Sequence, residues 1–380
     1  RRSAIDGIRV YAFRGGKAAP IPFQIDERDE RNRWMVRRGA RVLKPDETPG
    51  RLDDNDVLVL MNRDRGEKAD PAGLPDGASS WVELRVGPEG SPLGFAYVGS
   101  FAEPPARSEV DYCHYDEKTD RVRAETYDVT FGAPLPTRLR FANREGNALR
   151  AMRAHGEARF FGGLFTLRRT ERDIRAEIEG SVDGPVRVVR PARYEIALPL
   201  GFRATARINL LFYRDFVVGQ ATAKVKIPPR LVPADGELVA YFEFADESGG
   251  RLLLERGDVG ESIDGTMSPE ERRLVGTAAR WAALRLRDDR TFLVAVRPEG
   301  SLKKLDQRLY FHDGAAKPSF GFELAGVSRL ETGEHDLFVN VMLLESTAAE
   351  EIRRAATILA SPPEVHAEVL EPRGTAASPK

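Results

Sequence analysis

The sequence predicts an all-β protein of two antiparallel β-sandwich-like units, the second larger and supersandwich-like, with one or two short helices near the C-terminus. Short apolar or alternating segments recur at close spacing and are separated by Gly, Pro and Asp turns, a pattern typical of sandwiches and barrels. Helical patterns are scarce, so βαβ crossovers are not expected. At 380 residues the chain exceeds the size of a single hydrophobic core, which favours two domains.

The first unit is predicted to span residues 1–105. Ile8 to Phe13 precedes the Gly15-Gly16 turn, and Trp81 to Val86 alternates apolar and polar residues as a half-buried strand does. The segment Glu103 to Ala106 then interrupts the pattern, because its two prolines remove ladder donors. We therefore predict a boundary there, with a larger sandwich over residues 106–380.

The second unit is predicted to contain longer strands. They cover residues 120–131, 158–168, 174–179, 186–198 and 204–213. Residues 280–287 and 291–297 flank Asp288-Asp289-Arg290, which predicts a hairpin. Residues 321–327 and 337–344 are expected to pair in the same way.

Two helices are predicted near the C-terminus. Ser268-Pro269-Glu270-Glu271 combines an N-cap, a proline at the first helical position and a capping-box glutamate. A second helix opens at Thr347 and ends before Ser361-Pro362-Pro363. Residues 375–380 are predicted to form a disordered tail.

Charge and apolar patterning exclude several classes of protein. The 58 basic and 59 acidic side chains give a net charge of -1, which argues against nucleic-acid binding. The longest apolar runs, such as Val57 to Met61, are far shorter than the ~20 residues of a membrane-spanning helix. The start Arg1-Arg2-Ser3 carries no leader pattern, which fits a cytoplasmic protein or the mature form of an exported one.

A resemblance rests on four short segments in order along the chain. These are Pro22-Phe23-Gln24-Ile25-Asp26, the run from Asp53 to Leu60, Trp81-Val82-Glu83-Leu84, and Gly184 to Val189. The order is similar to that in bacterial secreted β-sandwich proteins related to the polysaccharide-lyase and mutarotase-like supersandwich families. The resemblance implies the fold and a periplasmic or extracellular location. It supplies no catalytic residue, because no lyase motif maps onto this chain.

The acidic residues of the first unit are a candidate calcium site. Asp26, Asp53, Asp54 and Asp56 could supply the oxygen ligands that Ca²⁺ prefers. Their spacing is not that of an EF-hand. Asp is also common in turns because its side chain bonds the local backbone, so a simple acidic turn is the alternative.

Aromatic and basic residues are candidate glycan contacts. Trp34, Trp81 and Trp281 could stack on sugar rings, although Trp is more often a core residue. Arg187 and Arg190 could neutralise uronate or phosphate groups. Interspersed acidic residues indicate cross-strand ion pairing as the alternative.

Cys113 is the only cysteine, so neither an internal disulfide nor a multi-thiolate metal site can form. His114 follows it directly, but neighbours on a strand point to opposite faces. A Cys-His nucleophilic pair is therefore not expected, and a buried, inert thiol is the prediction.

Two functional hypotheses follow. The first is a non-catalytic exported protein, either a structural or accessory subunit of an envelope or extracellular assembly that binds a protein partner, or a glycan-binding module. The second is a carbohydrate-active enzyme, a polysaccharide lyase with a Tyr or His base and Arg to stabilise the enolate. The sequence leaves the question of catalysis open and favours binding. An enzyme should show a groove gathering Arg with Tyr or His, and a subunit an apolar patch or exposed strand edge.

Overall fold

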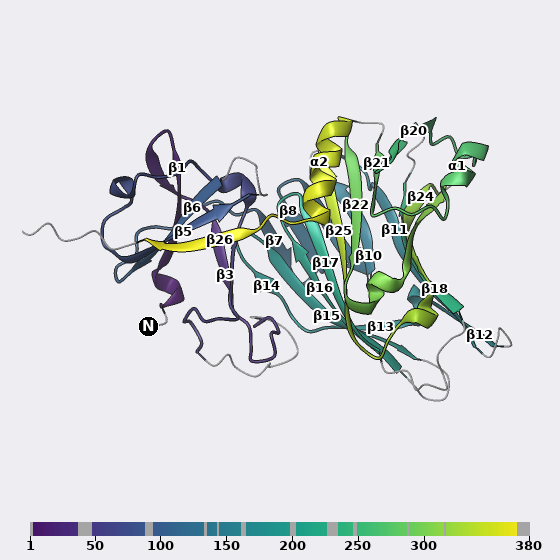
Figure 1. The fold of residues 1–380 in the computed structure, drawn as a ribbon, viewed down its shortest axis with the longest axis horizontal. Helices are drawn as coiled ribbons and strands as arrows, with labels where there is room; N and C mark the ends of the chain where they lie inside the picture. The colour runs from purple at the N-terminus through teal and green to yellow at the C-terminus, as the bar shows by residue number, and fades with distance from the viewer. Residues whose placement is uncertain are drawn as a thin grey trace, which may run out of the picture.

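The computed structural model describes residues 3–36, 48–87, 94–132, 135–142, 144–160, 165–197, 203–225, 235–245, 249–286, 289–314 and 317–370. Over these residues the chain is mostly β, with all its pairings antiparallel (Figure 1). No helix among them is long and apolar enough to cross a membrane. The predicted tail, residues 375–380, lies outside the described residues.

A small unit contains a five-stranded sheet and a separate two-stranded hairpin. In spatial order the sheet is β2 (Lys17–Pro20), β1 (Ile8–Arg14), β6 (Gly94–Phe101), β5 (Ala78–Val86) and β26 (Val365–Leu370). The hairpin is β3 (Phe23–Asp26) with β4 (Val57–Leu60). Short 3₁₀ turns occur at η1 (Ile5–Gly7), η2 (Asn62–Asp64) and η3 (Pro71–Gly73).

The larger unit is a sandwich of two sheets. In spatial order the nine-stranded sheet is β23 (Asp306–His312), β24 (Ser319–Ala325), β18 (Asp235–Phe244), β11 (Leu149–Phe160), β10 (Leu135–Phe141), β9 (Tyr127–Gly132), β8 (Arg121–Ala124) and β7 (Cys113–Asp116), and β12 (Phe165–Thr170) pairs with β11. The ten-stranded sheet is β13 (Ile174–Ile178), β15 (Val188–Ala197), β16 (Arg203–Phe212), β17 (Phe216–Val225), β25 (Gly333–Leu344), β22 (Thr291–Pro298), β21 (Trp281–Arg285), β19 (Arg251–Leu254) and β20 (Gly257–Ser262), and β14 (Val182–Asp183) pairs with β15.

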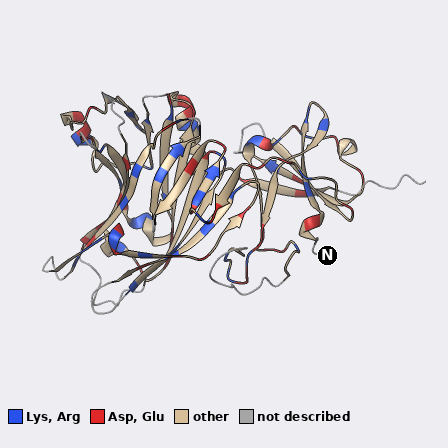
Figure 2. Ribbon diagram, turned by 180° about the vertical axis from the view of Figure 1, so that it is seen from behind, with Lys and Arg blue, Asp and Glu red and all other residues tan. Residues whose placement is uncertain are grey.

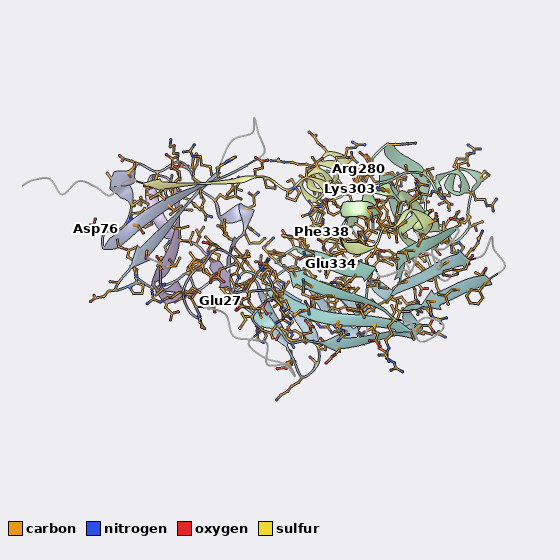
Figure 3. All side chains as sticks on the ribbon, turned by 60° about the horizontal axis from the view of Figure 1, so that its bottom comes forward. Glu27, Asp76, Arg280, Lys303, Glu334 and Phe338 are labelled. Carbon is orange, nitrogen blue, oxygen red and sulfur yellow. The ribbon has the colours of Figure 1, made fainter. Side chains whose placement is uncertain are left out.

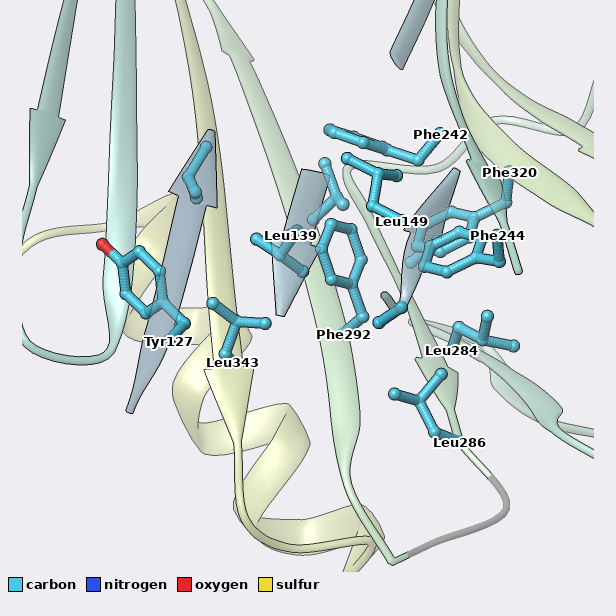
Figure 4. Packing of buried hydrophobic residues seen from close by; sticks show 14 of the residues in the cluster. Tyr127, Leu139, Leu149, Phe242, Phe244, Leu284, Leu286, Phe292, Phe320 and Leu343 are labelled. Carbon is cyan, nitrogen blue, oxygen red and sulfur yellow. The ribbon is translucent and has the colours of Figure 1, made fainter. Parts of the chain in front are cut away.

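The core of the sandwich is aromatic. Phe244 and Phe320 lie on the nine-stranded sheet and stack with their ring centroids 5.5 Å apart. Phe292 reaches them from the ten-stranded sheet, with its centroid 5.1 Å from that of Phe244 (Figure 4). All three rings are buried. The inward residues of both sheets thus form one continuous hydrophobic layer.

Helix α2 (Ala349–Ala360) covers part of the outer face of the ten-stranded sheet. Its buried residues, Ile352, Ala355, Ala356 and Leu359, recur at helical spacing and pack on Trp281 and Leu293. Helix α1 (Pro269–Leu274) begins with the predicted capping box, in which Ser268 and Glu271 bond each other's backbone N–H groups. Both predicted helices are confirmed.

Further 3₁₀ turns are η5 (Glu171–Asp173), η8 (Gly300–Lys304) and η9 (Val327–Arg329). Of these, η8 packs beside β25. Lys303 of η8 and the β25 residues Glu334 and Phe338 mark this region in Figure 3.

The hairpin β3–β4 lies between the small sheet and the ten-stranded sheet. Phe23 and Ile25 pack on the small sheet, whereas the intervening Gln24 and Asp26 meet the sandwich. Every residue of β3 is therefore buried. A Cβ at Gly184 would lie 2.4 Å from the Gln24 side chain, so a larger residue there would displace Gln24 from its bonds to the backbone of Val186 and Arg187.

Most predicted strands are confirmed, with three corrections. The segment 120–131 is not one strand, because β8 and β9 form a hairpin there. The segment 158–168 likewise contains the end of β11 and the start of β12, which pair with each other. The predicted pairing of 321–327 with 337–344 is wrong, because β24 and β25 belong to different sheets. The predicted hairpin of 280–297 is confirmed as β21 with β22.

The C-terminal strand corrects the predicted extent of the second unit. Residues 365–370 pair along their whole length with β5, so the first unit's sheet takes its last strand from the far end of the chain. The connection around Pro104-Pro105 falls between β6 and β7, in a stretch without strands. The boundary at that dipeptide stays a prediction.

Candidate ligand site at the junction of the two units

Three of the four predicted calcium ligands, Asp26, Asp53 and Asp56, are engaged in protein contacts, whereas Asp54 is exposed. Asp26 is buried and accepts a 2.8 Å hydrogen bond from Nε of Arg187. Asp53 accepts from the backbone of Asn55, and Asp56 accepts from the backbone of Asp53 at 2.9 Å, the local bonding of an acidic turn. Within the described ranges, no group of three or more His, Cys, Asp or Glu side chains could hold a metal ion.

The three tryptophans pack inside the protein. Trp34 and Trp281 are buried, and Trp81 is half-buried with its ring against Tyr11 and Phe101. The guanidinium of Arg187 lies 4.8 Å from the Trp34 ring centroid. The predicted use of Trp34 and Trp281 as sugar platforms is therefore wrong, because neither presents a ring to solvent.

The two predicted binding arginines form buried ion pairs. Arg187 lies 2.7 Å from Asp26 across the junction of the two units. Arg190 forms two hydrogen bonds with Asp120, of 2.8 and 2.6 Å, and lies over the Phe131 ring. Both side chains are almost inaccessible, so they hold the framework rather than offer a charge to a ligand.

Cys113 and His114 point to opposite faces, as predicted. Cys113 is buried, and its Sγ donates to the carbonyl of Phe212 at 3.4 Å. Burial raises the pKa of this thiol. His114 is exposed and pairs with Asp183 at 2.9 Å. Cys113 and His114 therefore do not pair with each other.

A serine-histidine contact was not predicted from the sequence. Nδ1 of His335 lies 3.1 Å from Oγ of Ser301, and Nε2 lies 2.9 Å from the carbonyl of Glu331. Both side chains are buried. A nucleophile needs access to a substrate, so the contact serves to hold η8 against β25.

A pocket of about 420 Å³ lies where the small unit meets the sandwich. It is assembled from the end of β1, the segment that leads into β3, the turn η2 and the stretch before β7. Its lining combines an apolar wall with a few polar groups: Arg14, Pro20, Ile21, Pro22, Arg63, Asp64, Ser108, Val110 and Tyr112. This composition and a position between two units are typical of ligand sites.

Asp64 is the most informative residue of this junction pocket. The residue is 6% exposed. Oδ1 accepts a 2.8 Å hydrogen bond from the phenol of Tyr112. Oδ2 is buried and has no hydrogen-bond partner within the described ranges. A buried carboxylate oxygen without a donor is costly, so it needs an explanation beyond packing.

Burial is the largest influence on the pKa values of Asp64 and Tyr112. Desolvation raises the pKa of Asp64, and the bond from Tyr112 and the charges of Arg14 and Arg63 act in the opposite direction. The pKa of Tyr112 rises to about 12, mainly through burial and also through its bond to Asp64. Residues with shifted pKa values that line a pocket are often functional, so Asp64 and Tyr112 favour a functional site here.

None of the site residues predicted from the sequence lines this pocket. Five lining residues, Pro20, Ile21, Pro22, Arg63 and Asp64, flank the hairpin strands β3 and β4 in the sequence. Nothing in the residue pattern singled out Arg14 or Ser108, because they reach the pocket only through the packing of the two units.

A second pocket, of about 260 Å³, lies on the nine-stranded sheet. Its lining is mostly charged, and the charges largely pair with one another. Arg159 bonds Glu157, and Arg329 and Arg308 contact Asp306. Basic and acidic residues are interspersed over the sandwich in the same way (Figure 2). In the part of the chain that the structure describes, no buried polar side-chain atom without a partner belongs to this lining.

No family model and no curated protein matches the sequence. Among solved structures, an alpha-mannosidase from Enterococcus faecalis V583 is similar, with a TM-score of 0.49 and 9% identity over 76% of this chain and 39% of that chain. The Slr1438 protein from Synechocystis sp. PCC 6803 has a TM-score of 0.38 and 10% identity over 65% of this chain and 99% of that one. The heparan sulfate lyase HepC from Pedobacter heparinus has a TM-score of 0.25 and 12% identity over 45% and 22%.

This chain thus spans well under half the length of the mannosidase and of the lyase. At such low identity and TM-score, the likeness concerns the arrangement of strands, and no activity is transferred from these proteins.

Proposed function

We propose that this chain is a non-catalytic carbohydrate-binding protein that holds a sugar in the junction pocket. The observation that carries the proposal is the buried Asp64, whose Oδ2 has no donor among the described residues and which lines a pocket together with Arg14 and Arg63. A ligand that satisfies this site must donate to the carboxylate and accept from the guanidinium groups.

Sugars meet both requirements, because each hydroxyl can donate and accept hydrogen bonds. In this proposal the Asp64 carboxylate accepts hydrogen bonds from sugar hydroxyl groups, and Arg14 and Arg63 donate to hydroxyl or carboxylate oxygens of the sugar. The apolar wall of Ile21 and Val110 suits the C–H face of a sugar ring. The volume of about 420 Å³ is within the usual range for small-molecule sites.

The pocket does gather Arg with Tyr, as a lyase would, but the state of Tyr112 disfavours catalysis. A lyase base must accept a proton from the substrate. Tyr112 is itself the donor in its bond to Asp64, and a pKa of about 12 keeps it protonated at neutral pH. Binding is therefore the function that this geometry supports best. An exported location is part of the proposal and is supported by the sequence resemblance alone.

Calorimetric titration with glucose, galactose, glucuronate and galacturonate tests the proposal. We expect at least one of these sugars to bind, and Arg63→Ala and Asp64→Ala to weaken it about tenfold or more, since each removes a charge-assisted hydrogen bond. Arg172→Ala, an exposed arginine outside the pocket lining, is the matched control.

Two results would count against the proposal. Binding that is unaffected by Arg63→Ala and Asp64→Ala would remove the junction pocket as the site. Appearance of unsaturated product when the protein is incubated with acidic polysaccharides would show a lyase and overturn the non-catalytic interpretation.

A further inference from the structure

Strand β26 leaves an open edge on the small sheet. It is the last strand in the sheet order, and no strand in the described part of the chain pairs with its outer side (Figure 1). Val365 and Val369 are 58% and 71% exposed, the highest values among the exposed large hydrophobic residues. Such an edge presents free backbone N–H and C=O groups and is a template for another strand.

The sequence of β26 is self-complementary. Residues 365–369 read Val-His-Ala-Glu-Val. If two copies pair antiparallel about Ala367, Val365 lies opposite Val369 of the other copy, and His366 lies opposite Glu368. The Val-Val contact and the His-Glu contact then each occur twice, as two-fold symmetry requires.

The apolar face of the sheet continues to this edge. Val365, Ala367 and Val369 alternate onto the same side as their partners on β5, Val86, Leu84 and Val82. Leu84 and Val82 belong to the core beneath the small sheet, whereas the valines of β26 extend past it into solvent. A further strand beside β26 would cover them.

We infer that β26 pairs with β26 of a second copy of this chain, so that the small five-stranded sheets of the two copies join into one continuous sheet across a two-fold axis. The chemistry that selects the partner is the contact of the His366 imidazole with the Glu368 carboxylate, which also pairs with Arg85 of β5, and the packing of Val365 on Val369. This inference is independent of the sugar-binding proposal, because the junction pocket contains no residue of β26.

The test is the oligomeric state of the whole chain between about 1 and 200 μM, by sedimentation velocity and light scattering. We expect a concentration-dependent dimer. His366→Glu places like charges opposite each other twice, and we expect roughly tenfold or greater weakening of the dimer. His366→Lys places a cation opposite Glu368 and should retain the dimer.

His366 is largely exposed and lies 3.6 Å from the carboxylate of Glu364, so both variants are expected to fold. Should either fail to fold, Val369→Lys serves the same purpose, because that side chain is 71% exposed. A monomer throughout the concentration range, or a dimer equally stable in wild type and His366→Glu, would overturn the inference.

Discussion

The phenol of Tyr112 donates a 2.8 Å hydrogen bond to Oδ1 of Asp64, across the junction between the sandwich and the small unit. The two residues are 48 positions apart in the chain. Their contact lines the junction pocket. It brings together a carboxyl and a phenol whose pKa values are both raised by burial.

Asp64→Asn is expected to increase stability at neutral pH in the absence of ligand. Because the pKa of Asp64 is raised in the folded state, its proton favours folding below the ordinary carboxyl pKa. That contribution is lost as the pH rises through the raised value. Asn carries no charge and can still accept from Tyr112.

The measurement is urea unfolding of both proteins between pH 3.5 and 8. The free energy of unfolding of the variant should exceed that of the wild type by little at acid pH and by more as the pH rises. The other carboxyl groups are the same in both proteins, so this difference reports on Asp64. An advantage that does not change with pH would contradict the raised pKa.

Arg187→Met is expected to destabilise the protein strongly, by about 3–5 kcal/mol, because it leaves the buried Asp26 without its charge partner. The double variant Arg187→Met/Asp26→Leu should recover much of the loss. Arg203→Ala, which breaks the exposed pair with Glu195, is the control and should cost less than about 1 kcal/mol. Chemical denaturation measures all three, and a loss below that of the control would contradict the structural role of Arg187.

Limited proteolysis is expected to cut between residues 102 and 109, where the backbone forms no strand and most side chains are exposed. The two fragments should remain associated on gel filtration, since β26 of the C-terminal fragment pairs with β5 of the other. They should separate only in denaturant. Resistance to cleavage would argue against the predicted domain boundary.

Cys113→Ala is expected to cost about 1 kcal/mol through the small cavity it leaves, with ligand binding intact. Labelling of the native thiol should be slow at neutral pH, because burial both shields the sulfur and raises its pKa. Rapid labelling accompanied by loss of sugar binding in Cys113→Ala would show a functional thiol instead.

Local patterns in the sequence determined the fold class, the hairpin at 280–297 and both helices. Each of these depends on neighbours in the chain: alternation specifies a strand, and Ser268 with Glu271 caps a helix within a single turn. The same local reasoning placed Cys113 and His114 on opposite faces of their strand.

Only the tertiary structure decided which surfaces are covered. Gln24 and Asp26 alternate with apolar residues in β3, yet the face that they share is buried against Arg187, 161 residues further along the chain from Asp26. Long-range packing also pairs β26 with β5 of the small sheet and places β24 and β25 in different sheets. It brings Arg14, Asp64 and Tyr112 together in the lining of one pocket. Periodicity reports which residues share a face of a strand, but it carries no information on what a distant segment places against that face.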